Sequence, residues 1–179
     1  LLKLVGYDKI AVENCRLRKA DPRMQIDLNS IAQGATSDYI AAYFEKLGIE
    51  EYMIEVGGEI FCRGLNAKGK PWVVGIDRPK EGNFTPGADL QVKISLSGKV
   101  LATSGNYRKF RTDSSGRKIV HTVDPRTGQP VTSDLLSATV VAETSAEADA
   151  YGTALMVMGL ERGKEFLAAH PEIQAYLIY

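Results

Sequence analysis

Hydrophobic and polar positions alternate in short runs along much of this 179-residue chain, and that pattern predicts many strands. The runs YMIEV and EIFCRG flank Gly57 and Gly58, so we expect a strand, a tight turn or bulge, and a second strand there. Further strands are expected within residues 3–17, 72–77, 90–96, 99–105, 118–131, 135–143 and 175–179.

Three segments predict helices. Residues 26–50 carry apolar side chains at three- to four-residue spacing, and Gly48 gives a C-terminal stop. The apolar positions are Ile31, Ala35, Tyr39, Ala42, Tyr43 and Leu47, and the candidate caps are Asp27, Asn29 and Ser30. Thr144 and Glu147 form a capping box before a second helix that Gly159 ends, and residues 161–169 predict a third. Strand runs interrupted by few helices, without strict alternation, favour an α+β fold with a largely antiparallel sheet.

Composition narrows the class of protein. The chain is 44% hydrophobic and 25% charged, which suits one compact domain or two small lobes with a real core. Its 22 Lys and Arg residues equal its 22 Asp and Glu residues, so neither nucleic acid nor an anionic membrane surface is an expected partner. Cys15 and Cys62 lack the spacing of a disulfide framework or a zinc site, and we expect two half-buried side chains.

Asp149 and Thr153 are the first candidates for chemistry. On a helix these positions share one face, so a carboxylate and a hydroxyl lie about a turn apart. Two oxygen ligands suit Mg²⁺, and the small residues Ala148, Ala150 and Gly152 leave room for a bulky ligand. The alternative is structural: Asp149 favours the positive end of the helix, and Thr153 bonds back to a carbonyl.

Two further motifs have both a functional and a structural interpretation. His121 precedes the DPRTG turn, where it can accept a proton near neutral pH or serve as a hydrogen-bonded structural residue. Gly57 and Gly58 permit close approach of a ligand to the backbone, or form a bulge.

Taken in order, several motifs resemble those of the ApbE-type flavin transferases, that is, FAD:protein FMN transferases. The motifs are DLNSIAQG (27–34), EVGGEI (55–60), PWVVGIDRP (71–79), ATSGNYRKF (102–110), HTVDPRTGQPV (121–131) and AEADAYGTALMVMG (146–159). The resemblance implies a T-fold-like structure and a Mg²⁺-dependent enzyme that cleaves FAD, transfers FMN to a Thr or Ser hydroxyl of a target protein, and releases AMP. It also implies an exported, periplasmic or lipid-anchored protein whose targets are subunits of membrane redox complexes.

The resemblance assigns roles residue by residue. It makes the side chains of Asp149 and Thr153 and the carbonyl of Ser30 the Mg²⁺ ligands. His121 becomes the candidate that accepts the proton of the incoming hydroxyl, and Asp149 is the competing candidate. The expected flavin-site residues are Gln33, Gly57, Gly58, Ser104, Gly105, Tyr107, Val123 and Gly152.

The chain departs from the family pattern in two ways. Position 33 is commonly Lys in the family and is Gln here, which removes one positive charge facing the phosphates. Family members also carry a substantial segment ahead of this region, so we expect residues 1–179 to be the C-terminal, catalytic portion of the domain. Two alternatives stay open: an FAD pyrophosphatase, in which water replaces the protein hydroxyl, and a non-catalytic flavin-binding protein.

Overall fold

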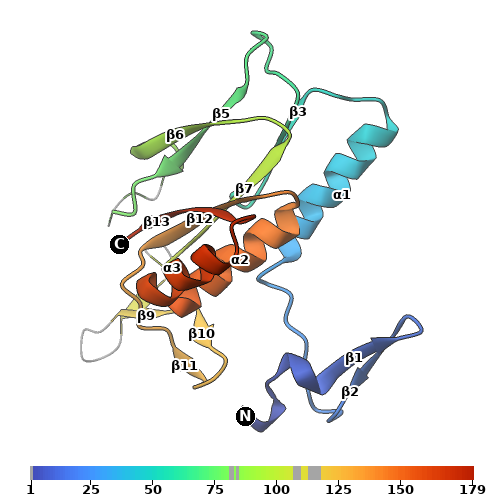
Figure 1. The fold of residues 1–179 in the computed structure, drawn as a ribbon, viewed down its shortest axis with the longest axis vertical. Coiled ribbons are helices and arrows are strands. Elements are labelled where there is room, and N and C mark those ends of the chain that lie inside the picture. Colours follow the sequence, from blue (N-terminus) through green and yellow to red (C-terminus); the bar gives the residue numbers. More distant parts are fainter. Residues whose placement is uncertain (1, 81–82, 84, 107–109, 113–117) are drawn as a thin grey trace.

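Figure 1 presents a computed structural model of the chain, in which residues 2–80, 83, 85–106, 110–112 and 118–179 are described. The predicted α+β class is confirmed. Every strand pairing among the described residues is antiparallel, and these residues include three α-helices.

A five-stranded sheet forms the centre of the fold, with the strand order β13-β12-β7-β4-β3. The strands are β3 (Tyr52–Val56), β4 (Glu59–Arg63), β7 (Lys99–Gly105), β12 (Ser137–Ala142) and β13 (Gln174–Ile178). Gly57 and Gly58 connect β3 to β4 as a tight turn, and their φ angles of 65° and 112° explain why glycine occupies both positions.

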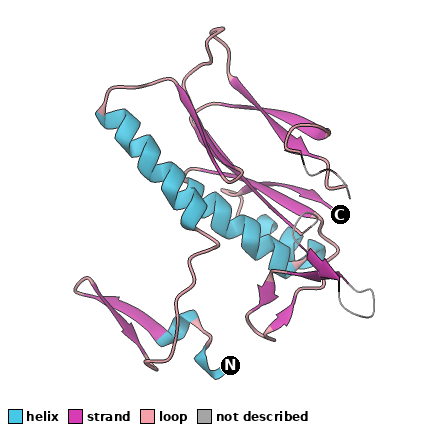
Figure 2. Cartoon of the chain, turned by 180° about the vertical axis from the view of Figure 1, so that it is seen from behind, coloured by secondary structure: helices cyan, strands magenta, loops and turns pink. Residues whose placement is uncertain are grey.

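The other strands among the described residues form four two-stranded pairs. They join β1 (Ile10–Glu13) to β2 (Arg16–Lys19), β5 (Trp72–Asp77) to β6 (Leu90–Leu96), β8 (Phe110–Thr112) to β9 (Lys118–Val120), and β10 (Val123–Asp124) to β11 (Gln129–Pro130). The β1–β2 hairpin stands apart from the sheet and helices, connected through an extended segment that leads to α1 (Figures 1 and 2).

The helices α1 (Ala32–Lys46), α2 (Ser145–Met158) and α3 (Leu160–Ala169) lie on one side of the sheet, and the β5–β6 pair lies on the other (Figure 1). Side chains alternate accordingly. On β7, Val100 and Ala102 pack in the core cluster beneath α2 and α3, whereas Leu101 packs with Val74 and Leu96 of the β5–β6 pair. The central strands are therefore buried on both faces.

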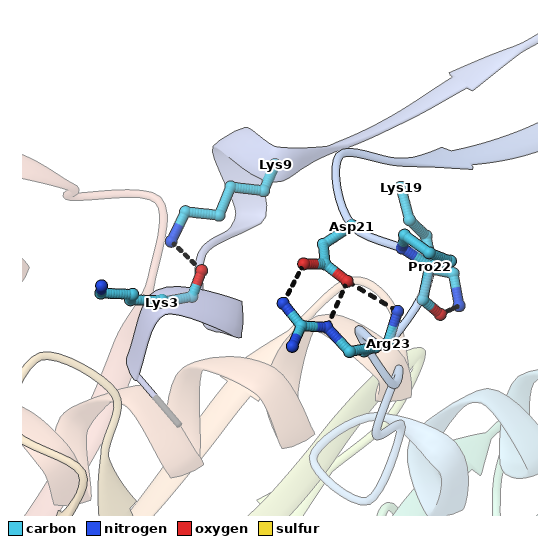
Figure 3. Close-up of polar contacts among 6 residues, drawn as sticks. All are labelled: Lys3, Lys9, Lys19, Asp21, Pro22 and Arg23. Carbon is cyan, nitrogen blue, oxygen red and sulfur yellow. Dashed lines mark hydrogen bonds and ion pairs between the residues drawn. The ribbon is translucent and has the colours of Figure 1, made fainter.

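Backbone carbonyls hold the segment before α1 together. Two short 3₁₀ helices, Leu2–Leu4 and Tyr7–Lys9, open the chain. The Lys9 ammonium donates to the carbonyl of Lys3 at 3.1 Å, and the Lys19 ammonium donates to the carbonyl of Pro22 at 2.9 Å (Figure 3). Asp21 accepts from the guanidinium of Arg23 at 2.6 Å. These contacts fix the turns on either side of the β1–β2 hairpin.

The apolar spacing predicted the helix α1, but its large apolar side chains are not the buried ones. Tyr39, Tyr43 and Leu47 are 79%, 60% and 57% exposed. The buried residues of this helix are the small ones, Gly34, Ser37 and Ala41, because α1 packs closely against its neighbours.

The predicted cap of α1 was also wrong, because α1 begins after Ile31 with no side-chain cap and Asp27 instead bonds the N–H of Asn29. For α2 the prediction is confirmed: Thr144 accepts from the N–H of Glu147 at 3.3 Å. The prediction that both cysteines are half-buried was wrong as well. Cys15 is exposed, and Cys62 is fully buried between the sheet and the β5–β6 pair.

We expect truncation of Leu155, which is 0% exposed beneath the sheet, to destabilise the fold. Leu155→Ala should lower the free energy of unfolding by about 2–5 kcal/mol, because it leaves a cavity. The same change at the exposed Leu47 should alter it by no more than about 0.5 kcal/mol. Denaturant unfolding of both variants measures the difference, and equal losses would contradict the assigned burial.

Candidate active site

The carboxylate of Asp149 is buried where the N-terminal ends of α1 and α2 meet. Asp149 is 5% exposed, and its Oδ2 accepts a hydrogen bond of 3.2 Å from the backbone N–H of Gly34. Burial raises the pKa of this carboxyl group, and the Gly34 bond partly opposes that shift. Within the described part of the chain, no cationic side chain pairs with this carboxylate.

Gly34 makes this approach possible. A Cβ atom built at Gly34 would lie 2.2 Å from the carbonyl oxygen of Ser145 at the start of α2, so any larger residue would push the two helices apart. The Gly34 N–H also occupies the position that donates to the carbonyl of residue 30 in an uninterrupted helix. Because this N–H bonds Asp149 instead, it leaves the Ser30 carbonyl without its helical donor.

Thr153 faces the end of β7, one turn along α2 from Asp149. Its hydroxyl lies 3.5 Å from the hydroxyl of Ser104. Gly152 packs against the same serine, and a Cβ atom there would approach the Ser104 hydroxyl to 2.9 Å. Thr153 thus reaches across to the sheet, and three of the predicted site residues meet at this point. Gly105, which ends β7, follows Ser104 directly and pairs with Ser137.

Gln33 and Gly57 form a second group at the start of α1. The side chain of Gln33 lies against the β3–β4 turn so closely that a Cβ atom at Gly57 would come within 2.1 Å of its Nε2 atom. Gly58 is the other residue of this turn. The structure therefore brings the α1 terminus, which also contacts Asp149, next to the double glycine that the sequence marked as a site of close approach.

His121 and Val123 lie on a separate segment that follows β9 and enters β10. A hydrogen bond of 3.1 Å from the Thr122 hydroxyl to the Asn106 side chain ties this segment to the end of β7, two residues beyond Ser104. His121 is exposed, and its role stays a prediction. Tyr107 falls outside the described residues.

Hydrogen bonds to Asp124 hold the DPRTG turn after Val123. Asp124 accepts from the backbone N–H of Arg126 and from its guanidinium, and together these bonds lower the pKa of Asp124 to about 2. The same carboxylate opens the turn that the sequence predicted, so this motif holds the β10–β11 hairpin in shape.

Sequence reasoning missed three residues of this region, namely Gly34, Asp38 and Asn106. The signal for Gly34 was a glycine in the first turn of a helix, which is unfavourable unless close packing requires it. Asp38 carried no such signal, because it bonds the distant backbone N–H groups of Ser145 and Ala146. Asn106 carried none either, because its partner Thr122 lies between β9 and β10.

The arrangement offers one buried carboxylate, a neighbouring hydroxyl and a carbonyl. Across the described residues, no three His, Cys, Asp or Glu side chains converge as a metal cluster. An oxygen-ligand site with few protein groups remains the chemistry that this geometry suits. A cleft of about 410 Å³ lies elsewhere, at the far end of α2, lined by residues 132–134 and 157–162.

Comparisons with known proteins agree on one family. A sequence profile described as the ApbE family matches residues 1–177. An FAD:protein FMN transferase of Haemophilus influenzae is 38% identical over 178 residues, covering 97% of this chain and 50% of that protein. The Escherichia coli protein of the same name is 38% identical over 149 residues, covering 83% of this chain and 41% of that protein.

Solved structures give the same answer. The flavin transferase ApbE from Vibrio cholerae matches with a TM-score of 0.85 and 36% identity, over 99% of this chain and 54% of that one. The Thermotoga maritima ApbE protein matches with a TM-score of 0.82 and 28% identity, over 99% and 56% of the two chains. The chain spans about half the length of the curated relatives it matches.

The buried charge of Asp149 should destabilise the metal-free fold at neutral pH. Because burial raises its pKa above the ordinary 3.8, this cost is fully present above the raised pKa and disappears as the pH falls below the ordinary value. We expect Asp149→Asn to raise the melting temperature in a chelating buffer at pH 7. This gain should shrink towards zero below about pH 4. Thermal unfolding of both proteins across this range tests it, and an Asn variant that melts lower at pH 7 would contradict it.

Proposed function

The chain belongs to the ApbE family, and from that premise we propose that it carries out Mg²⁺-dependent transfer of FMN from FAD to a Thr or Ser hydroxyl of a target protein, with release of AMP. The relatives named FAD:protein FMN transferase support the reaction type. Because this chain spans about half their length, we propose the activity for the chain itself and take residues 1–179 as the portion that holds the catalytic groups.

One observation carries the proposal: Asp149 is a buried carboxylate that has a single backbone donor and no cationic partner among the described residues. Such a charge costs free energy in the folded protein. A protein keeps a costly charge of this kind where a ligand uses it. A divalent cation beside Asp149 would supply the positive charge that the protein itself does not.

The available oxygen atoms fit Mg²⁺. The proposed ligands are the carboxylate of Asp149, the hydroxyl of Thr153 and the carbonyl of Ser30, whose helical donor is engaged by Asp149. Mg²⁺ typically takes one or two carboxylates and completes its shell with water and substrate phosphate. When bound, it supplies Lewis-acid polarisation of the pyrophosphate and neutralises charge as the phosphorus is attacked.

The remaining residues bind and orient FAD in this proposal. Gln33 lies beside the β3–β4 turn at the start of α1, where its amide can donate to a phosphate oxygen. An amide donates without adding charge, so the phosphates are neutralised less here than beside a Lys. Gly152 and Ser104 keep the junction of α2 and β7 narrow. We assign Gly58, Gly105, Tyr107 and Val123 to the same binding surface on the basis of the resemblance.

A proton must leave the hydroxyl that attacks FAD. We propose His121 as the proton acceptor, since this exposed side chain is accessible to an incoming protein and its segment is tied to the end of β7 near Thr153. Asp149 is the competing candidate, but a carboxylate engaged with a cation is a weaker base.

We also propose that the protein that receives FMN is a subunit of a membrane redox complex and that this chain acts as an exported, periplasmic or lipid-anchored enzyme. In the described ranges, no helix is both long and apolar enough to span a membrane.

The reaction can be tested by adding FAD to the chain with and without Mg²⁺ and separating the products. We expect Mg²⁺-dependent AMP release that Asp149→Asn reduces at least about 100-fold, because the variant lacks the charge that holds the metal. Asp134→Asn is the matched control, since Asp134 accepts a hydrogen bond from the N–H of Leu160 at the start of α3.

The products distinguish the reactions. FMN bound covalently to an acceptor protein supports the transferase, whereas free FMN with AMP identifies an FAD pyrophosphatase. FAD that binds and is never cleaved identifies a non-catalytic flavin-binding protein. Unchanged AMP release by Asp149→Asn would refute the metal assignment.

His121 is tested by the change to Asn, which keeps a polar side chain but cannot accept the proton. Loss of general-base catalysis should reduce the transfer rate by about 10²- to 10⁴-fold, with FAD binding retained. His170→Asn is the control, because His170 is the other histidine of the chain and bonds Glu172 after α3. A loss of less than about tenfold would favour Asp149 as the base.

A further inference from the structure

The carboxylate of Asp38 joins α1 to the first turn of α2. Asp38 lies on α1, and its Oδ1 accepts from the backbone N–H of Ser145 at 2.8 Å while its Oδ2 accepts from the N–H of Ala146 at 3.0 Å. Both donors are N–H groups that a helix leaves unsatisfied at its start. A negative charge in this place also interacts favourably with the positive end of the α2 dipole.

This contact is the second of two hydrogen-bonded connections between the helices, which we call rungs. Gly34 and Asp38 are one turn apart on α1, and Ser145 and Asp149 are one turn apart on α2. Gly34 donates to Asp149, and Asp38 accepts from Ser145, so the helices run antiparallel at their N-terminal ends. Two rungs one turn apart fix both the separation of the helices and their sliding along one another.

The proposed metal ligands are divided between the two elements that these rungs connect. Ser30 lies just before α1, whereas Asp149 and Thr153 lie on α2. Mg²⁺ requires near-ideal octahedral geometry with short bonds, so a small displacement of one helix would spoil the ligand set. The rung at Gly34 is itself part of the candidate site, whereas Asp38 holds the register from outside it.

We propose that Asp38 is a positioning residue of the metal centre, which sets α2 against α1 so that the oxygen atoms of Ser30, Asp149 and Thr153 are held at one cation. This inference rests on the proposed function. In this role Asp38 is not a metal ligand, and it acts through the backbone of Ser145 and Ala146.

Thr144 provides a matched control, because it caps the same helix without connecting it to α1. Its hydroxyl accepts from the N–H of Glu147, within the first turn of α2. Thr144→Ala therefore weakens the start of α2 to an extent comparable with loss of one Asp38 bond, and it leaves the rungs between the helices in place.

The experiment measures Mn²⁺ binding by electron paramagnetic resonance, with FAD present, for the wild type, Asp38→Ala, Asp38→Asn and Thr144→Ala. We expect Asp38→Ala to weaken Mn²⁺ about 10- to 100-fold, as is typical when support for a metal ligand is removed. Asp38→Asn keeps one acceptor oxygen, so its Mn²⁺ affinity should lie between those of Asp38→Ala and the wild type. Thr144→Ala should lower the melting temperature and leave Mn²⁺ affinity unchanged.

Each outcome decides the matter. Asp38 variants that melt lower but bind Mn²⁺ as the wild type does would show that Asp38 serves stability alone and would overturn the inference. If Thr144→Ala weakened Mn²⁺ binding as much as the Asp38 variants do, the inference would also be overturned. Any loosening of the start of α2 would then be enough to weaken Mn²⁺ binding. A wild type that binds no Mn²⁺ would refute the proposed metal centre and the role of Asp38 with it. If Asp38→Ala does not fold, Asp38→Asn gives the same comparison.

Discussion

The close contact between the N-terminal ends of α1 and α2 is the constraint on which the site depends. Gly34 touches the carbonyl of Ser145 at a distance that excludes any side chain, and this contact places the Gly34 N–H on the carboxylate of Asp149. The helices, the central sheet and the β5–β6 pair form three layers. One hydrophobic core lies between the helices and the sheet, where it holds α2 against β7, and another lies between the sheet and the β5–β6 pair. The fold thus supports one buried charge, and the candidate site lies where α2 meets the start of α1.

Much of the fold follows from local pattern. The strands, the turn at Gly57 and Gly58 and the cap at Thr144 were readable because each depends on neighbours in the sequence. The residues that α1 buries did not follow from the local pattern. A large aromatic such as Tyr39 outweighs small residues in any hydrophobic pattern, yet close helix packing selects Gly34 and gives it the buried position.

Local spacing predicted one feature of the candidate site, whereas its long-range contacts lay beyond any sequence pattern. Spacing of four residues placed Asp149 and Thr153 on one face of a helix, and the structure has both on α2. What spacing does not contain is the partner of each group. Asp38 bonds N–H groups more than a hundred residues away, and Gly34 bonds Asp149 across a similar separation. Such contacts exist only after the sheet has brought α1 and α2 together.

The charge of the candidate site leads to a last step. Asp149 lacks a cationic partner among the described residues, and the nearby Gln33 carries no charge. A phosphate entering this region would be repelled by the carboxylate of Asp149 and only weakly attracted by the neutral hydrogen-bond donors. In the proposed function a cation therefore has two roles, which are to offset the buried charge of Asp149 and to attract the phosphates of FAD. Binding of metal and of FAD should be mutually dependent, because each supplies the charge that the other needs.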